Sequence, residues 1–329
     1  MQKKEIRILS AEDVRRCLPM EQAIEAVKSA FIQLSAGEAR VPLRSRIDLN
    51  ANDRALFMPV YLPRQKMTAV KTVTVFPHNG ARGLPAIQAM LMVFDARDGR
   101  PLALLDGETL TAIRTGAASG LATDLLALPE AKTLALFGAG VQARSQFRAV
   151  RQVRPVERVL ITDPNEARAH ALVAEICRSH PDLQVKIATA KEAAQAADII
   201  CTATTSTVPV FRDEWLRPGV HINGIGSFTP EMQEIPAETV QRAALFADAR
   251  AACLQEAGDI LIPLKKGYIS EAHIRAEIGE VAAGKAEGRK DAQEITFFKS
   301  VGNGVQDLAA AAVVLRNAEK QGTGRKIKL

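Results

Sequence analysis

The stretch that decides the fold is Leu134–Ala–Leu–Phe–Gly138–Ala–Gly140–Val–Gln–Ala143. It reads as a hydrophobic strand, a G-x-G-x-x-A turn and the start of a helix. Gly138 permits the tight turn, Gly140 lets the backbone approach a pyrophosphate, and Ala143 allows the helix to pack closely on the strand. The helix N-terminus adds N–H groups and a partial positive charge. This context predicts a Rossmann domain that binds a dinucleotide.

The surrounding sequence repeats the same alternation of strand and helix. Hydrophobic, β-favouring runs are separated by stretches with helical spacing of apolar residues, which predicts a doubly wound parallel sheet of α/β class. The expected strands are 133–137, 159–162, 185–188, 199–203, 221–225 and 244–247, and the expected helices are 141–153, 165–180 and 191–197.

The first part of the chain has a different pattern. Ser10 is expected to cap a first helix, and a second helix is expected over 20–34. Short β-favouring runs follow at 46–49, 55–60, 68–75 and 87–94, and a helix rich in small residues is expected over 109–128. A last helix over 306–320 is expected to return to this part. We therefore predict a mixed α+β domain of residues 1–128 plus 304–329, into which a Rossmann domain of residues 129–303 is inserted.

The composition excludes several functional classes. The 329 residues, 47% of them hydrophobic, suffice for two domains with ordinary cores. The net charge of +6 comes without a long basic run, and aromatic residues make up only 4%, so we expect no nucleic-acid partner. No signal peptide or segment of roughly 20 apolar residues occurs, so we expect a cytoplasmic protein without a membrane partner. Four widely spaced cysteines are expected to be buried free thiols, with no metal site: Cys17, Cys177, Cys201 and Cys253.

An acidic residue bears on the choice of cofactor. Asp163 closes the second expected strand, where a carboxylate binds the ribose hydroxyls and repels a 2′-phosphate. This favours NAD(H). Arg168 lies nearby and is able to neutralise a phosphate, so NADP(H) remains open. The alternative interpretation of Asp163 is a helix cap.

Small polar residues follow two later strands. Thr202 and Thr204 end the fourth strand, and residues 223–227 end the fifth. Ligands of doubly wound sheets lie beyond the carboxyl ends of the strands, so these residues are placed to line the cofactor. Ordinary turn chemistry at strand ends is the alternative explanation.

Three basic residues in the first domain point to an anionic substrate. Lys71 lies within an apolar strand, where a charge is costly unless it has a partner. Arg44, and Arg114 at the expected start of a helix, offer planar forks that suit a carboxylate. The alternative for each residue alone is a structural salt bridge or an outward-facing position.

The residues together resemble the ornithine cyclodeaminase/mu-crystallin family, which includes archaeal alanine dehydrogenases and ketimine reductases. The resemblance covers nearly the whole chain. The stretches that carry it include Val41–Pro–Leu–Arg44, Val70–Lys71, Gly83–Leu–Pro–Ala–Ile–Gln–Ala89, Ala112–Ile–Arg–Thr–Gly–Ala–Ala118, His221–Ile–Asn–Gly–Ile–Gly226, Glu294–Ile–Thr–Phe–Phe–Lys–Ser–Val–Gly302 and Val305–Gln–Asp307.

The resemblance implies a homodimer of subunits with a Rossmann domain and a substrate-binding and dimerisation domain. It implies that Arg44, Lys71 and Arg114 hold the substrate carboxylate and that Lys71 is the catalytic lysine. The residues that it places at the cofactor are Arg114, Thr115, Gly138, Gly140, Val141, Gln142, Asp163, Thr204, Ile225, Gly226, Ser227 and Ser300.

Two positions depart from the cyclodeaminases. Phe228 stands where those enzymes and the archaeal alanine dehydrogenase carry an acid/base aspartate, and Leu56 stands near the glutamate that holds the ornithine side-chain amine. A phenylalanine cannot exchange protons, and an ammonium left unpaired beside a leucine would cost several kcal/mol. Deamination of ornithine is therefore disfavoured, whereas ketimine reductases also lack the aspartate.

We therefore predict NAD(P)H-dependent reduction of a small anionic substrate, a cyclic α-imino acid. Δ1-Pyrroline-2-carboxylate would give L-proline, and Δ1-piperideine-2-carboxylate would give L-pipecolate. The alternatives are an ornithine cyclodeaminase, an alanine-type amino-acid dehydrogenase, and a binding protein that keeps the cofactor without turnover.

Overall fold

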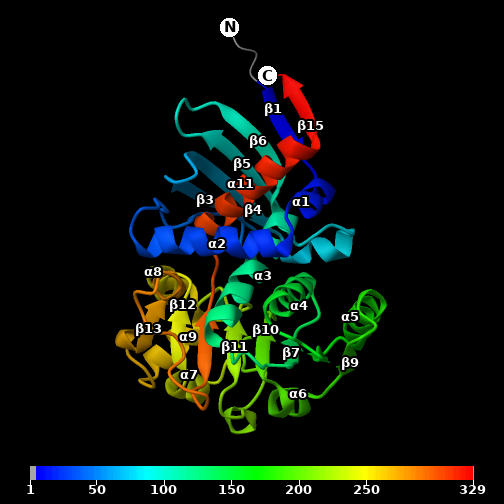
Figure 1. Cartoon of the computed structure of the whole chain (residues 1–329), viewed down its shortest axis with the longest axis vertical. Helices are drawn as coiled ribbons and strands as arrows, with labels where there is room; N and C mark the ends of the chain where they lie inside the picture. Colours follow the sequence, from blue (N-terminus) through cyan, green and yellow to red (C-terminus); the bar gives the residue numbers. More distant parts are fainter. Residues whose placement is uncertain (1–4, 329) are drawn as a thin grey trace. The chain divides into compact units, whose positions relative to one another are not determined.

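The computed structural model describes residues 5–328, which divide into two compact units. The first unit comprises the chain up to Arg114 and from Asn303 onward, and the second comprises Thr115–Gly302. Figure 1 traces the chain through both units. The sequence predicts the first boundary after residue 128. The structure divides the chain earlier, inside helix α3 (Gly107–Leu126), because this helix runs without a break from one unit into the other.

The first unit is built on a mixed sheet of seven strands. Its order is β15-β1-β6-β5-β4-β3-β2, in which β2 to β6 form an antiparallel meander, β1 runs parallel to β6, and β15 runs antiparallel to β1. The strands are β1 (Glu5–Leu9), β2 (Ser45–Asp48), β3 (Arg54–Leu62), β4 (Met67–Val75), β5 (Ile87–Asp95), β6 (Pro101–Asp106) and β15 (Arg325–Lys328). The sequence predicted β2 to β5 and missed the other three.

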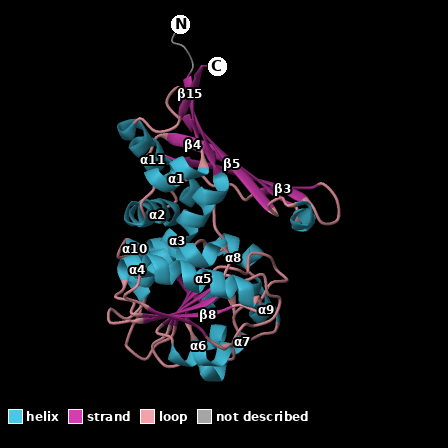
Figure 2. Ribbon diagram, turned by 90° about the vertical axis from the view of Figure 1, so that its right-hand side faces the viewer, coloured by secondary structure: helices cyan, strands magenta, loops and turns pink. Residues whose placement is uncertain are grey.

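Helices cover one face of this sheet, as Figure 2 shows. They are α1 (Ala11–Cys17), α2 (Met20–Ser35) and α11 (Gly304–Gln321), with a short 3-10 helix η1 (Pro77–Arg82) beside β4. Ser10 caps α1 through a capping box with Asp13, as predicted. Helix α11 packs on α2, β3 and β4, so the return of the last helix to the first part of the chain is confirmed.

The opposite face of the sheet carries apolar side chains. Cross-strand partners share a face, so the pairs Phe57–Thr72 and Thr72–Met90 place these residues together. Met90 is 51% exposed and Ile47 52% exposed. We call these side chains the outer sheet face: Ile47, Phe57, Val70, Met90 and Met92.

The second unit is a doubly wound parallel sheet. Its eight strands have the order β13-β12-β14-β11-β10-β7-β8-β9, so the chain order reverses between β7 and β10. The strands are β7 (Thr133–Phe137), β8 (Arg158–Thr162), β9 (Gln184–Ile187), β10 (Ile199–Thr202), β11 (His221–Gly224), β12 (Ala244–Ala247), β13 (Ile274–Glu277) and β14 (Thr296–Lys299). The predicted α/β class is confirmed, although β13 and β14 were not predicted.

Short helices connect these strands. They are α4 (Val141–Val153), α5 (Glu166–Ser179), α6 (Ala190–Ala196), α7 (Ala237–Arg242), α8 (Arg250–Glu256), α9 (Gly258–Lys265) and α10 (Ile278–Ala282), with 3-10 turns η2 (Asp213–Trp215) and η3 (Glu271–His273). Among residues 5–328, we find no helix with the length and apolar character that a membrane span requires.

Two local predictions were wrong. Arg114 does not start a helix: α3 begins at Gly107, one residue after β6, so Arg114 lies in its middle. Cys177 is exposed on α5, because it points away from the face that buries Ile176, whereas the other three cysteines are buried free thiols.

Candidate functional site

The glycine turn after β7 is built for a close approach. Gly138 has a positive φ of 99°, and a Cβ there would lie 2.6 Å from the Ala203 carbonyl oxygen, so only glycine fits. A Cβ at Gly140 would meet nothing within 4 Å, which leaves open space over the turn. Gly140 is also the N-cap of α4 and has no side-chain cap. The first N–H groups of α4 therefore face a space that fits a pyrophosphate.

Asp163 ties this turn to the end of β8. Its Oδ2 accepts a hydrogen bond from the Ala139 N–H at 2.7 Å, and its Oδ1 accepts one from the Asn165 N–H at 2.8 Å. The cap of α5 is Asn165, which accepts from the Arg168 N–H at 3.0 Å. Asp163 is half-buried and lies beside the glycine turn, so it is not the helix cap that the alternative interpretation proposed.

A buried glutamate that the sequence analysis did not single out organises the ends of β10 and β11. Glu234 Oε1 accepts from the Thr204 N–H at 2.6 Å and from the Thr204 hydroxyl at 2.8 Å. Its Oε2 accepts from the Gly226 N–H at 2.7 Å and from the Ser227 N–H at 3.1 Å. Glu234 is fully buried, and both burial and Asp259 raise the pKa of its carboxyl. One carboxylate thus holds two loops that the sequence placed at the cofactor.

Two more buried acids support the neighbouring strand end. Asp259 accepts from the Glu234 N–H at 2.7 Å and pairs with the Lys299 ammonium at 2.9 Å, both side chains being fully buried. Asp248 accepts from the Ser300 hydroxyl at 2.8 Å. Since β14 lies beside β11, Ser300 joins the row of polar residues at the carboxyl ends of the strands.

The basic residues of the first unit meet on the helix-covered face of its sheet. Lys71 on β4 is 1% exposed and lies opposite Met58 of β3. Its Nζ is 2.7 Å from Asp307 Oδ2 and donates to the Thr111 hydroxyl at 3.2 Å. Arg114 donates from Nε to Asp307 Oδ1 at 2.9 Å. Asp307, in the first turns of α11, therefore joins two of the three predicted basic residues.

The surroundings of Lys71 lower the pKa of its ammonium. Burial lowers the pKa of its ammonium, Asp307 raises it, and Arg114 and Arg44 lower it, with a resulting pKa of about 8. Arg44, in the loop before β2, is therefore close enough to act on Lys71. The three basic residues form one electrostatic cluster, which we call the cation cluster: Arg44, Lys71 and Arg114.

Two buried amides lie at the start of α11. Gln306 accepts from Arg114 Nη1 and from the Asn303 N–H, while Asn303 Oδ1 accepts from the Val305 N–H at 3.1 Å. Among the described residues, the amide nitrogens of Asn303 and Gln306 have no hydrogen-bond partner. The helix N-terminus therefore presents two further donors beside the cation cluster.

The two departures from the cyclodeaminase pattern lie at different sites. Leu56 is half-buried on β3, on the same sheet face as Lys71, because it lies two residues from Met58. Phe228 is 42% exposed and follows Ser227 in the loop that Glu234 holds. Each departure therefore belongs to one of the two groups of candidate site residues.

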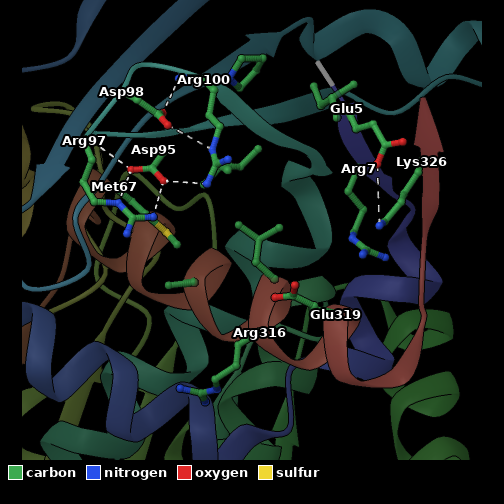
Figure 3. Close-up of a pocket in the computed structure, with 15 residues that line it drawn as sticks. Glu5, Arg7, Met67, Asp95, Arg97, Asp98, Arg100, Arg316, Glu319 and Lys326 are labelled. Carbon is green, nitrogen blue, oxygen red and sulfur yellow. Dashed lines mark hydrogen bonds and ion pairs between the residues drawn. The ribbon is translucent and has the colours of Figure 1, made fainter. Parts of the chain in front are cut away.

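A separate hollow of about 770 Å³ lies in the first unit, beside β1, β6 and α11 (Figure 3). Its charged side chains are largely paired with one another. Arg97 and Arg100 both contact Asp95, and Lys326 contacts Glu5. The hollow lacks the buried, converging cations that characterise the cluster around Lys71.

Asp307 and Glu234 carry only weak signals in the sequence. Each is an acidic residue next to apolar ones, as in Asp307–Leu–Ala–Ala–Ala and Glu234–Ile–Pro. A charged residue among apolar neighbours indicates that its side chain is buried and pairs with a cation or hydrogen-bond donors. Asp307 lies 193 positions after Arg114. Glu234 accepts partly from backbone N–H groups, those of Thr204, Gly226 and Ser227, which no side-chain pattern marks. The sequence alone therefore does not identify these contacts.

Comparison with known proteins places the whole chain in one group. The model of the ornithine cyclodeaminase/mu-crystallin family matches residues 4–322. A Δ1-pyrroline-2-carboxylate reductase of Bacillus cereus is 38% identical over 323 residues, which cover 98% of this chain and 99% of the relative.

Two solved structures share the fold. The Δ1-pyrroline-2-carboxylate reductase of Thermococcus litoralis, in complex with NADH and L-proline, has a TM-score of 0.94 and 40% identity and covers 98% of this chain and 100% of its own. An archaeal alanine dehydrogenase dimer with bound NAD has a TM-score of 0.93 and 34% identity and covers 99% of each chain.

Proposed function

Because the chain belongs to the ornithine cyclodeaminase/mu-crystallin family, we propose that it is an NAD(H)-dependent reductase of Δ1-pyrroline-2-carboxylate, which yields L-proline. The observation that carries this proposal is the pair of buried cations Lys71 and Arg114, which Asp307 contacts at 2.7 and 2.9 Å. The Bacillus cereus and Thermococcus litoralis relatives, which are named for this reaction, favour the five-membered ring over the six-membered one.

The cation cluster binds the substrate carboxylate in this proposal. Arg114 is held through Nε by Asp307 and through Nη1 by Gln306, and among the described residues its Nη2 has no hydrogen-bond partner. Nη2 is therefore available to a carboxylate, with Arg44 as a second cation. The unpaired amide nitrogens of Asn303 and Gln306 add neutral donors.

Lys71 supplies the proton. NADH, when bound, supplies a hydride to the imine carbon. Lys71 loses one Nζ–H proton to the imine nitrogen, where an N–H bond forms as the C=N double bond becomes single. NADH is oxidised to NAD⁺, and Lys71 is left neutral and recovers a proton from water. A pKa of about 8 suits this role, because Lys71 is largely protonated at neutral pH and yet releases its proton readily.

The second unit binds the cofactor in this proposal. The open turn at Gly140 receives the pyrophosphate, and the loops held by Glu234 lie at the reactive end. Asp163 favours NAD(H), because its carboxylate binds ribose hydroxyls and repels a 2′-phosphate. The remaining cofactor contacts come from the family pattern: Arg114, Thr115, Gly138, Val141, Gln142, Thr204, Ile225, Gly226, Ser227 and Ser300. We propose that the enzyme acts in the cytoplasm.

Two residues argue against the alternative reactions. Leu56 has no charge with which to hold the side-chain ammonium of ornithine, and Phe228 has no proton to exchange during release of ammonia. By the family pattern, a cyclodeaminase and an alanine-type dehydrogenase both need an acid/base group at position 228, and a cyclodeaminase also needs a carboxylate near position 56. A binding protein without turnover does not require a lysine whose pKa is lowered, so the cation cluster favours catalysis.

We further propose that the protein is a homodimer through the outer sheet face. A contiguous exposed apolar surface on a sheet is typical of an interface. The archaeal alanine dehydrogenase relative is a dimer, and a second copy of this chain offers a matching apolar sheet.

The test is an assay of imine-dependent oxidation. NADH and NADPH absorbance are followed separately with the five- and six-membered imines. We expect rapid oxidation of NADH with Δ1-pyrroline-2-carboxylate and a loss of at least a hundredfold in kcat in Lys71→Ala, in keeping with the size of acid–base effects. Lys132→Ala, at a lysine that is 54% exposed, is the matched control. Ammonia release from ornithine or alanine without imine-dependent oxidation would contradict the proposal.

A further inference from the structure

One buried carboxylate lies between two cations of the proposed substrate site. Asp307 Oδ2 is 2.7 Å from Lys71 Nζ, and Asp307 Oδ1 accepts from Arg114 Nε at 2.9 Å. The side chain of Asp307 is fully buried, and that of Lys71 is 2% exposed. The two oxygens therefore fix two cations from different elements, β4 and α3, with respect to each other.

Asp307 lies near the N-terminus of α11. It lies in the acidic first turn of this 18-residue helix, where the backbone N–H groups give a positive potential. Its two contacts are charge-assisted, and these are stronger than neutral hydrogen bonds. Asp307 thus contacts the ammonium of Lys71 and the guanidinium of Arg114 at the same time.

The groups that face Lys71 have opposing effects on its charge. Arg114 from α3 and Arg44 from the loop before β2 repel its ammonium, and Asp307 from α11 attracts it. Thr111 of α3 accepts a hydrogen bond from it and carries no charge. Burial also disfavours the ammonium. Asp307 is the group in this set whose charge favours the protonated lysine.

We propose that Asp307 is a positioning residue of the reductase: it keeps Lys71 protonated and aligns Arg114 for the substrate carboxylate, without itself exchanging a proton. This inference rests on the proposed function. In the reduction, the proton moves from Lys71 Nζ to the imine nitrogen and returns from water. No bond to hydrogen forms or breaks at Asp307, and the substrate contacts Lys71 and Arg114.

The proposal predicts the direction in which a variant changes the pH profile. The reduction needs protonated Lys71, so activity is full below the pKa of Lys71 and is lost above it. Asp307→Asn keeps the size of the side chain and removes its charge. The pKa of Lys71 then falls below its value of about 8, and the loss of activity moves to lower pH.

The experiment compares kcat and kcat/KM from pH 6 to pH 10 in the wild type, Asp307→Asn and Asp98→Asn. Asp98 is 53% exposed and serves as the control. We expect the basic limb of Asp307→Asn to shift down by about one pH unit or more, with NADH affinity within twofold of the wild type. Because the substrate titrates identically with all three proteins, a difference between them reports the enzyme. A limb that stays in place, or moves up, would overturn the inference.

A second variant covers the case in which Asp307→Asn does not fold. The double variant Lys71→Met, Asp307→Asn removes both charges of the pair, and we expect circular dichroism to show that it recovers the fold. Failure of the double variant to fold would mean that the uncompensated charge of Lys71 is not what destabilises Asp307→Asn, and would overturn the claim that Asp307 acts on Lys71. A wild type that does not reduce the imine would instead contradict the proposed function.

Discussion

At the scale of single residues, Asp163 is a carboxylate with a structural role and, in the proposed function, a second role in cofactor selectivity. It accepts hydrogen bonds from the N–H groups of Ala139 and Asn165 and so joins the glycine turn to the end of β8. It remains half-buried, so its charge acts on a ligand that reaches the turn. In the proposed function, the geometry of the turn and the choice of cofactor depend on the same side chain.

Asp163→Asn is expected to reduce the preference for NADH. The amide oxygen still accepts from one of the two N–H groups, that of Ala139 or that of Asn165, while the amide NH2 faces the other. The neutral amide no longer repels a 2′-phosphate. We expect the ratio of kcat/KM for NADH to that for NADPH to fall about tenfold, which corresponds to about 1.4 kcal/mol. Steady-state assays with both cofactors measure this ratio, with Asp182→Asn as the exposed control. An unchanged ratio would show that Asp163 does not contribute to selectivity.

The residues of the site differ in how far sequence predicts them. Arg44, Lys71 and Arg114 are basic residues in unusual contexts, and the family resemblance gives them a shared role. Asp307 was missed because its partners lie in distant parts of the chain. Glu234 was missed because it contacts backbone N–H groups, which no side-chain pattern marks. Lys71 contacts a carboxylate that follows the entire second unit in sequence. Local sequence patterns do not show which residues far apart in the chain come into contact.

At the scale of elements, the buried side chain of Glu234 connects the loops that follow β10 and β11. Glu234 accepts from Thr204 on one side and from Gly226 and Ser227 on the other. A Cβ at Gly226 would lie 2.1 Å from the Thr204 carbonyl oxygen, so the two loops pack without spare room. The cofactor loops thus depend on a carboxylate that is itself fully buried.

Glu234→Gln is expected to weaken cofactor binding selectively. A carboxylate only accepts hydrogen bonds, whereas a glutamine amide turns one acceptor into a donor that faces other donors. An unsatisfied buried donor costs about 1–3 kcal/mol. We expect the KM for NADH to rise roughly tenfold, in proportion to that cost, while the KM for the imine changes much less. Titration of NADH fluorescence gives the Kd directly. The control is Glu231→Gln, at an exposed site; equal changes in both KM values would contradict a role confined to the cofactor loops.

The elements that sequence predicts well are those with a local pattern. Strands β7, β8 and β10 to β12 are hydrophobic runs between helical stretches, and they were found. Strand β15 reads Arg–Lys–Ile–Lys and pairs only with β1 at the edge of the sheet, so it has no apolar run. Strand β14 contains Lys299, whose charge is compensated by Asp259. These strands are defined by their partners and not by their own composition.

At the scale of the whole molecule, the outer sheet face is the surface that a second copy would cover. Its apolar residues alternate along β2 to β5 with residues that pack against the helices, so these strands carry apolar residues on both faces, with Thr68, Thr72 and Thr74 also on the outer face of β4. Strands that are apolar on both faces are typical of sheets buried on both sides. In a dimer, the second copy would bury the outer sheet face, so that both faces of the sheet are covered.

Met90→Glu is expected to convert the proposed dimer into a monomer. Met90 is 51% exposed near the middle of the outer sheet face, and two symmetry-related glutamates would bring like charges together without partners. Light scattering coupled to size-exclusion chromatography measures the mass. Ile187→Glu, at an exposed apolar residue on β9, is the matched control. A wild type that is monomeric, or a variant that remains dimeric, would rule out this interface.

The discontinuity of the first unit has a consequence for synthesis on the ribosome. Asp307 is made 193 residues after Arg114, which takes roughly 10–40 s at usual rates of translation. During that interval the cations of Lys71 and Arg114 lack their carboxylate, and β1 lacks its neighbour β15. The second unit is contiguous, and by the end of that interval all its strands have been synthesised. We therefore expect the second unit to fold before the first. A chain that ends before α11 would lack Asp307 and β15, so its first unit could not complete its fold.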